Sequence, residues 1–391
     1  MAEPAAKRAL TEANDQGNGV EKSLDAAAAT TWSPTSWRSF PIQQQPEYED
    51  MPQLKQVCDD ISRLPPIVQP AEIDRLKAQL GEVAAGRRFI LQGGDCAERF
   101  MDCTPDRIEA KLKILLQMSL VMVWGARVPL VRIGRIAGQY MKPRSQALEK
   151  VDGQDVYTYK GDSINSFDLS ARQPDPNRLR EAFFYSTSTM NYVRSLLSSG
   201  FADLHHPDTW DLSFVKVGDK RKIYEDVIAV GPTTVISELI DLVRKINPTD
   251  EPGRITLITR FGHDKVQELL PPVIRAIKAA NITVAWECDP MHGNTRKADG
   301  GIKTRSFDHI LKELLTTFDV HRDEQSWLGG IHFELTGDDV TECTGGSTGL
   351  RDADLAANYE SFCDPRLNCH QSLEMAFLMA ERLKQVRHHS T

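Results

Sequence analysis

Short apolar runs recur along the chain, and most of them turn polar at a glycine or an aspartate. Runs of this kind are typical of buried parallel strands that end at a polar rim. Five runs fit the pattern well, at 89–94, 128–135, 255–262, 282–289 and 330–337, and a sixth fits it weakly, at 226–234. The pattern predicts an α/β fold built on a parallel sheet.

Helices are predicted between these runs, where apolar residues recur at helical spacing. Thr104 and Pro105 open a long helix, because threonine is a good N-cap and proline is favoured in the first turn. Gly200 ends another helix. Besides the long helix after Thr104, helices are expected in the fifties, over 70–84, over 175–199 and over about 370–386.

The number of strands limits the architecture. A closed (βα)8 barrel needs eight strands, and the chain offers five or six. We therefore expect a (βα)8 TIM-barrel-like domain that is incomplete, as an open or patched sheet or through the loss of some units.

Three regions are expected along the chain. Residues 1–30 are rich in Ala, Glu and Asn and lack periodic apolar positions, which predicts a disordered segment. Region 31–85 would hold an extended arm, over 32–48, followed by two helices. Region 86–391 would form the incomplete barrel domain.

Composition excludes some classes of protein. The chain has 391 residues, 40% of them hydrophobic, and a formal net charge of −8. The acidic balance argues against a nucleic-acid binder that relies on broad phosphate neutralisation. The longest apolar stretch, 114–126, is interrupted by Gln117 and closed by Arg127. It is too short for a membrane span and suits a buried helix.

The N-terminus and the cysteines indicate the compartment. Without a secretory apolar core and with few arginines, the N-terminus predicts a cytoplasmic protein. Seven irregularly spaced cysteines do not make a disulfide framework, so reduced thiols are expected. One hypothesis concerns Cys363, which adjoins Asp364. If Asp364 binds the same metal as Cys96, the two thiols would form a redox-sensitive pair.

Four residues with metal-ligating side chains follow apolar, strand-like runs: Cys96, His292, Glu334 and Asp364. Strand ends gather on one face of a parallel α/β fold, so these side chains can converge on one ion. The mixture of donors suits Mn²⁺, Co²⁺, Fe²⁺ or Zn²⁺ better than Mg²⁺ or Ca²⁺, and Mn²⁺ is our first expectation. The alternative is that the cysteine is a small buried apolar residue and the aspartate caps a turn.

Cationic residues give a second signal. Arg135 and Arg260 follow predicted strands, so both could face the metal rim and bind phosphate or carboxylate. Lys142, Arg144 and Ser145 form a candidate second anion pocket. Two such pockets beside a metal would imply a pair of anionic substrates. The alternative is that each cation is a solvated loop charge.

Other signals are weaker. Lys303 and Arg305 precede a predicted helix and are expected to be ordinary helix-start charges. The alternative is that they extend the cationic field around the metal. The sequence contains no P-loop, dinucleotide glycine fingerprint, nucleophile elbow or HExxH motif.

Several long segments together resemble the type II 3-deoxy-D-arabino-heptulosonate 7-phosphate (DAHP) synthases: WSPTSWRSFPIQQQPEY, LQGGDCAERF, GRIAGQYMKPRS, ITLITRFG, DPMHGNT, HFELTGDDVTECTGG and CDPRLN. The resemblance implies a (βα)8 barrel, a homo-oligomer, and phosphoenolpyruvate and erythrose 4-phosphate as substrates. It also implies a divalent metal at the four candidate ligands, phosphoenolpyruvate at Arg135 and Arg260, and erythrose 4-phosphate at the KPRS loop.

One interval departs from the family pattern. Between 202–210 and 231–234, family members carry TSHE, WIGERTRQ and NPxGVKVGP strands; the first two are absent here, and Ala229 stands where the third has lysine. The loss removes part of the expected anion clamp. Two alternatives to an active synthase therefore stay open: a catalytically silent metal-binding relative that associates with a complete synthase, and a shortened gene product without a stable fold.

Overall fold

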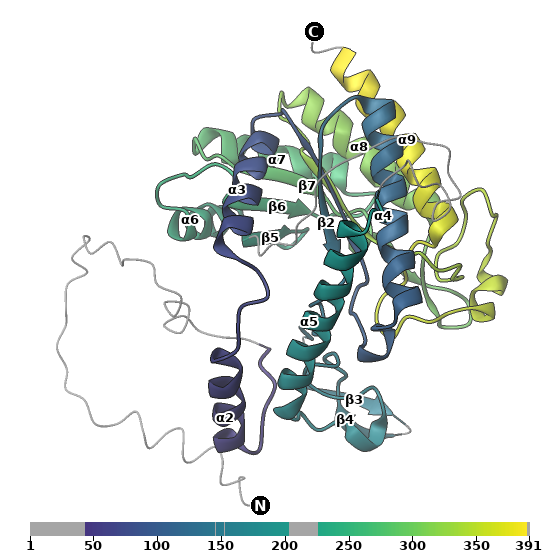
Figure 1. Cartoon of the computed structure of the whole chain (residues 1–391). Helices are drawn as coiled ribbons and strands as arrows, with labels where there is room; N and C mark the ends of the chain where they lie inside the picture. Colours follow the sequence, from purple (N-terminus) through teal and green to yellow (C-terminus); the bar gives the residue numbers. More distant parts are fainter. Residues whose placement is uncertain (1–43, 145, 152, 203–225, 389–391) are drawn as a thin grey trace, which may run out of the picture. The chain divides into compact units, whose positions relative to one another are not determined.

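The computed structural model describes residues 44–144, 146–151, 153–202 and 226–388, which belong to one compact unit, Gln44–Thr391 (Figure 1). The segment expected to be disordered, most of the expected arm and Ser145 lie outside the described residues.

A sheet of six parallel strands forms the centre of this unit, in the order β2-β1-β10-β7-β6-β5. Its strands are β1 (Phe89–Gly94), β2 (Leu130–Arg135), β5 (Asp226–Val230), β6 (Ile255–Thr259), β7 (Ala285–Cys288) and β10 (Gly330–Glu334). β1, β6, β7 and β10 are buried along their whole length, which explains why most of their residues are apolar. Gln92, Glu287 and His332 are buried polar exceptions within these strands. The five strong strands and the weak one are all confirmed, and the weak one is β5.

The strand order shows how far the sheet corresponds to the expected barrel. Within the described ranges, β2 and β5 are the outer strands, and neither pairs with a further strand. The α/β class is confirmed, and six parallel strands are compatible with part of a TIM-like barrel.

Eight helices are described: α2 (Met51–Ser62), α3 (Pro70–Ala84), α4 (Pro105–Ala126), α5 (Asn177–Ser198), α6 (Ile236–Ile246), α7 (Val266–Ala279), α8 (Phe307–Asp323) and α9 (Cys369–His388). Short 3-10 turns are η2 (Phe100–Asp102), η3 (Leu169–Ala171), η5 (His292–Asn294) and η6 (Asp352–Ala357). Thr104 is the N-cap of α4 as predicted, but its side chain makes no capping hydrogen bond. Pro105 therefore supplies the local start signal.

The apolar stretch of α4 is buried as predicted. Its side chains join the main core, and α4 runs beside α9 (Figure 1). Gly125 permits the close approach, since a Cβ atom there would lie 2.6 Å from the Cβ of Ala380. None of the helices in the described part of the chain combines the length and apolarity that crossing a membrane requires.

The carboxyl ends of three strands lie level with one another. Gly94, the last residue of β1, pairs with Glu334 of β10 on one side and with Arg135 of β2 on the other. Gly94 has a φ of 148°, and a Cβ atom there would lie 2.3 Å from the carbonyl oxygen of Arg135. Only glycine fits this position. The register therefore brings a carboxylate and a guanidinium to the same edge of the sheet.

Two small antiparallel hairpins were not predicted, β3 (Leu148–Val151) with β4 (Gln154–Tyr157), and β8 (Thr295–Lys297) with β9 (Lys303–Arg305). Their strands are three or four residues long and mostly polar. Strands this short carry no usable hydrophobic period.

Candidate metal centre

Three of the four predicted ligands converge. The ligand atoms of Cys96, Glu334 and Asp364 all lie within 4.8 Å of one another, and Cys96 Sγ is 3.4 Å from Asp364 Oδ2. Glu334 ends β10, and Cys96 lies two residues beyond β1, so the parallel register positions both. Buried thiol and carboxylate groups this close together are a candidate metal site.

His292 reaches the edge of this group. Its Nε2 atom lies 3.2 Å from Glu334 Oε1. It is not among the residues whose ligand atoms are mutually within 4.8 Å. The structure thus brings the imidazole beside one of the three ligands and not into the cluster itself.

A cationic side chain lies against the cluster. The ammonium of Lys142 contacts Cys96 Sγ and Asp364 Oδ2 and lies 3.9 Å from Glu334 Oε1. Burial alone would lower the pKa of Lys142, but these acidic neighbours raise it well above its usual value. The donors therefore favour a positive charge, and their chemistry fits a divalent ion. Binding such an ion requires Lys142 to move away.

The acidic ligands differ in how they are held ionised. Burial opposes ionisation of Glu334, but Arg305 and His292 hold its pKa well below the usual range. Burial also opposes ionisation of Asp364, and Lys142 is the main group that lowers its pKa to about 2. Both carboxylates are therefore charged at neutral pH and available to a cation.

The expectation for Lys303 and Arg305 was wrong. Both lie on β9, ahead of the first residue of α8. The side chain of Arg305 is fully buried, and its Nη1 atom donates to Glu334 Oε2 at 2.6 Å. Lys303 Nζ lies 3.4 Å from Asp364 Oδ1. Sequence reasoning gave this placement only as the alternative, because the pairing of β8 with β9, which brings both residues to the site, leaves no hydrophobic pattern in the sequence.

Asp289 is a second residue that sequence reasoning missed. It is buried directly after β7, and its Oδ2 atom accepts from His292 Nδ1 at 2.7 Å. Burial would raise the pKa of Asp289, but His292 and other cationic neighbours hold it well below its usual range. A carboxylate on Nδ1 fixes the orientation of the ring and leaves Nε2 facing Glu334. Its place just past an apolar strand was the available signal.

The predicted anion-binding cations lie around this centre. Arg135 Nη2 donates to the carbonyl oxygens of Gly94 at 3.1 Å and Phe333 at 2.9 Å. Arg260 Nε lies 3.4 Å from Asp289 Oδ2, and about a third of its side chain is exposed. Arg144 donates to Tyr159 O and to Cys363 Sγ. Their binding of anions stays a prediction.

Comparisons with known proteins identify the family of the chain. The model of the class-II DAHP synthetase family matches residues 32–229 and 227–380. The chain belongs to this family. A phospho-2-dehydro-3-deoxyheptonate aldolase of Neurospora crassa is 41% identical over 460 residues, covering 92% of this chain and 96% of the relative. One of Streptomyces coelicolor is 39% identical over 432 residues, covering 88% of this chain and 96% of the relative.

The family match also locates what this class-II DAHP synthetase family member lacks. Its two parts meet at 227–229, at the start of β5. The alignment with the Neurospora crassa relative runs over 460 positions, although the chain has only 391 residues. Both observations agree with the absence of an internal family segment before β5, as the strand count indicated.

A buried glutamate links the loops that carry Arg260 and His292. Glu313 of α8 accepts from the backbone N–H groups of Phe261 and Gly262 at 2.8 and 2.9 Å. Its other oxygen accepts from Asn294 Nδ2 at 2.7 Å. Burial raises the pKa of Glu313 to about 7. This side chain therefore fixes the two loops relative to each other.

Changing Asp289 to asparagine is expected to weaken Mn²⁺ binding by about 10–100-fold, because an amide holds His292 Nδ1 less firmly than a carboxylate does. Isothermal titration of the metal-free protein measures this. Asp299→Asn, an exposed aspartate seven residues beyond His292, is the matched control and should bind Mn²⁺ normally. An unchanged affinity in Asp289→Asn would show that His292 needs no such support.

The hypothesis of a Cys96–Cys363 pair now has a geometric basis. The two thiols pack in one buried cluster. The proximity of the two groups lowers the pKa of Cys363 to about 7 and raises that of Cys96. A thiol with a lowered pKa is the more reactive partner.

We expect mild peroxide treatment of the metal-free protein to remove two of its seven titratable thiols. Mn²⁺ should prevent the loss, since Cys96 would be coordinated. Thiol titration under denaturing conditions measures this, and Cys363→Ser is the control that cannot form the pair. Retention of all seven thiols would refute the pairing.

Proposed function

We propose that this chain catalyses the reaction of the class-II DAHP synthases, the metal-dependent condensation of phosphoenolpyruvate with erythrose 4-phosphate that begins the shikimate pathway. Family membership supports the reaction class. For this chain, the main supporting observation is that Cys96, Glu334 and Asp364 converge around the ammonium of Lys142.

We infer that Cys96, Glu334, Asp364 and His292 bind one divalent ion, with Mn²⁺ the first choice. A thiolate, two carboxylates and an adjacent imidazole suit Mn²⁺ and its transition-metal neighbours better than Mg²⁺ or Ca²⁺. Bound there, the ion would polarise the aldehyde carbonyl of erythrose 4-phosphate as a Lewis acid. Asp289 keeps the imidazole oriented, and Arg305 keeps Glu334 ionised.

The cations around the centre would bind and orient the substrates. We assign Arg135 and Arg260 to phosphoenolpyruvate, because guanidinium groups pair with carboxylate and phosphate through two parallel hydrogen bonds. Lys142, Arg144 and Ser145 are assigned to erythrose 4-phosphate. When Lys142 leaves the metal ligands, its ammonium becomes available to a phosphate group. Holding both substrates close together in the reactive orientation would supply much of the rate enhancement.

A catalytically silent, metal-binding relative is the second candidate. The specific observation in its favour is the family match in two parts that meet at the start of β5, next to Ala229, where the family pattern has lysine. Each missing charged contact in a dry site lowers the rate by roughly a hundredfold or more. Such a protein would keep the metal ligands and associate with a complete synthase.

Phosphate release from phosphoenolpyruvate distinguishes the two candidates. An active synthase needs erythrose 4-phosphate and Mn²⁺ together, loses activity with a chelator and regains it when Mn²⁺ returns. Cooperative melting and measured metal content must first show that the protein is folded and loaded. If such a sample released no phosphate, the protein would be a catalytically silent, metal-binding relative.

We also infer that the protein works in the cytoplasm and assembles with copies of itself. Family resemblance supports both statements. Light scattering of the purified chain, with and without Mn²⁺, measures the assembly.

A further inference from the structure

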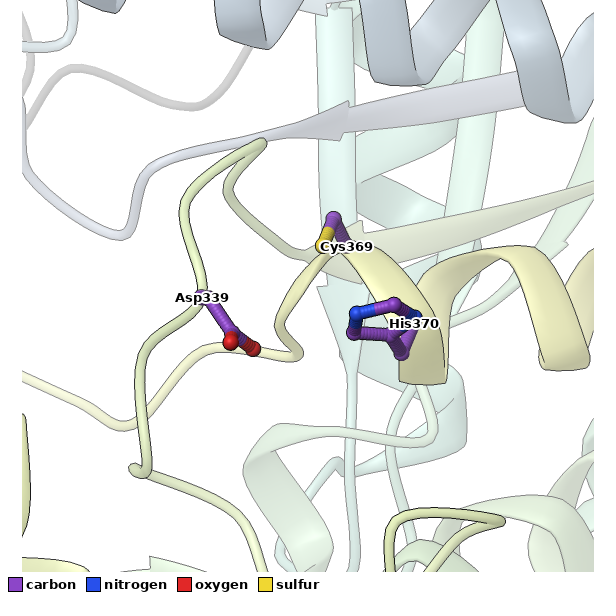
Figure 2. Close-up of side chains that lie close together, drawn as sticks. All are labelled: Asp339, Cys369 and His370. Carbon is purple, nitrogen blue, oxygen red and sulfur yellow. The ribbon is translucent and has the colours of Figure 1, made fainter. Parts of the chain in front are cut away.

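A second group of metal-ligating side chains lies outside the centre described above. Figure 2 shows Asp339, on the loop after β10, facing Cys369 and His370, the first two residues of α9. The ligand atoms of these three residues all lie within 4.8 Å of one another. Asp339 and His370 are exposed and Cys369 is half-buried, so an ion can reach them from solvent.

The backbone around this group is fixed by hydrogen bonds. Cys369 N donates to Asp338 O at 3.4 Å, and Asn358 Nδ2 donates to Asp339 O at 2.9 Å. Asn368 Nδ2 donates to Val340 O at 3.0 Å. The loop after β10 is therefore held against the start of α9 independently of any ion. Only side-chain rotation is needed to close a site.

The donors match one class of ion. A thiolate, an imidazole and a carboxylate with an open fourth position for water form a typical zinc ligand set. With zinc bonds of about 2.0–2.3 Å, ligand atoms in a tetrahedral site lie about 3.5 Å apart. The three donors lie within 4.8 Å of one another, and two of the side chains are exposed, so a rotation of these side chains can bring the donors to that spacing.

Electrostatics also favours a thiophilic cation. The carboxylate of Asp339 lies beside the Cys369 thiol and the His370 imidazole. A metal ion replaces the thiol proton and neutralises the nearby carboxylate, which a monovalent or hard cation does poorly.

We propose that Asp339, Cys369 and His370 form a second metal site, selective for a thiophilic divalent ion such as Zn²⁺. It shares no residue with the Cys96 centre, and it does not depend on the proposed reaction. An ion here would fasten the loop after β10 to the start of α9. That loop leads directly from Glu334, so the second ion would restrain the segment next to the first centre.

Peptide-resolved alkylation of the full chain tests the proposal. Two equivalents of Zn²⁺, enough to fill both metal sites, are expected to slow iodoacetamide labelling of Cys369 about tenfold or more, because a coordinated thiolate is a poor nucleophile. Cys58, exposed on α2, is the internal reference and should label at the same rate with and without zinc. Mn²⁺ at the same concentration should leave Cys369 reactive.

His370→Ala supplies the matched variant, since His370 is exposed and the change should leave the melting temperature unchanged. Protection of Cys369 by zinc should disappear in this variant. Competition with a chromophoric chelator should count one zinc ion fewer in the variant than in the unmodified chain. Protection that persists in His370→Ala, or equal zinc counts, would overturn the proposal.

Discussion

Changing Cys96 to serine is expected to lower kcat/KM for phosphoenolpyruvate by about 10²–10³-fold, as removal of one key electrostatic contact does in other enzymes. The substitution removes the softest of the converging ligands and leaves a hydroxyl that does not ionise near neutral pH. Affinity for Mn²⁺ should fall in parallel. Initial rates at saturating Mn²⁺, together with a metal titration, measure both effects.

A matched control separates the metal ligand from thiol loss in general. Cys58→Ser removes an exposed thiol on α2 and should leave both rate and affinity unchanged. If Cys96→Ser kept full activity and normal Mn²⁺ affinity, the assignment of this residue as a ligand would be wrong. If no version of the chain is active, the titration alone still tests the assignment.

Changing Arg366 to methionine is expected to lower the free energy of unfolding by about 3–5 kcal/mol, the usual cost of leaving buried charges without their partner. Arg366 Nη1 donates to Asp95 Oδ1 at 2.6 Å, and its Nη2 donates to Glu342 Oε1 at 2.7 Å. Asp95 also contacts Lys111 of α4. All four side chains are buried, so water cannot replace the lost contacts.

This ionic network also ties together the segments that carry the metal ligands. Asp95 precedes Cys96, and Arg366 lies two residues beyond Asp364. Urea unfolding of the metal-free protein measures the loss of stability without the contribution of bound metal. Arg275→Met, which removes an exposed guanidinium from its pair with the half-buried Glu324, should change the unfolding midpoint much less. A similar midpoint for both variants would show that the network is not structurally important.

The strands were predictable because each carries its signal locally. β1, β6, β7 and β10 are buried along their whole length, so most of their residues are apolar, and the runs stood out from the surrounding sequence. β5 begins where the two parts of the family match meet, and its apolar run was the weakest. The hairpins β3–β4 and β8–β9 escaped detection because their strands are short and polar.

The site was predictable only in part. Cys96, Glu334 and Asp364 were found because each follows a strand-like run, and the register of β1 with β10 brings two of these segments together. Lys142 was expected to bind an anion, but here it contacts the metal ligands themselves. Its position depends on a loop path that no local pattern specifies.

The sequence by itself determined the α/β class, the positions of the strands, the family and the ligand candidates at the strand ends, since each depends on residue type and short-range spacing. The tertiary structure alone decided that Arg305 is buried against Glu334, that Asp289 orients His292, and that Arg366 joins two ligand-bearing segments. These roles depend on which distant segments meet in a dry interior. A buried charge in that interior is stable only beside an opposite charge, and the order of residues along the chain does not specify which residue supplies it.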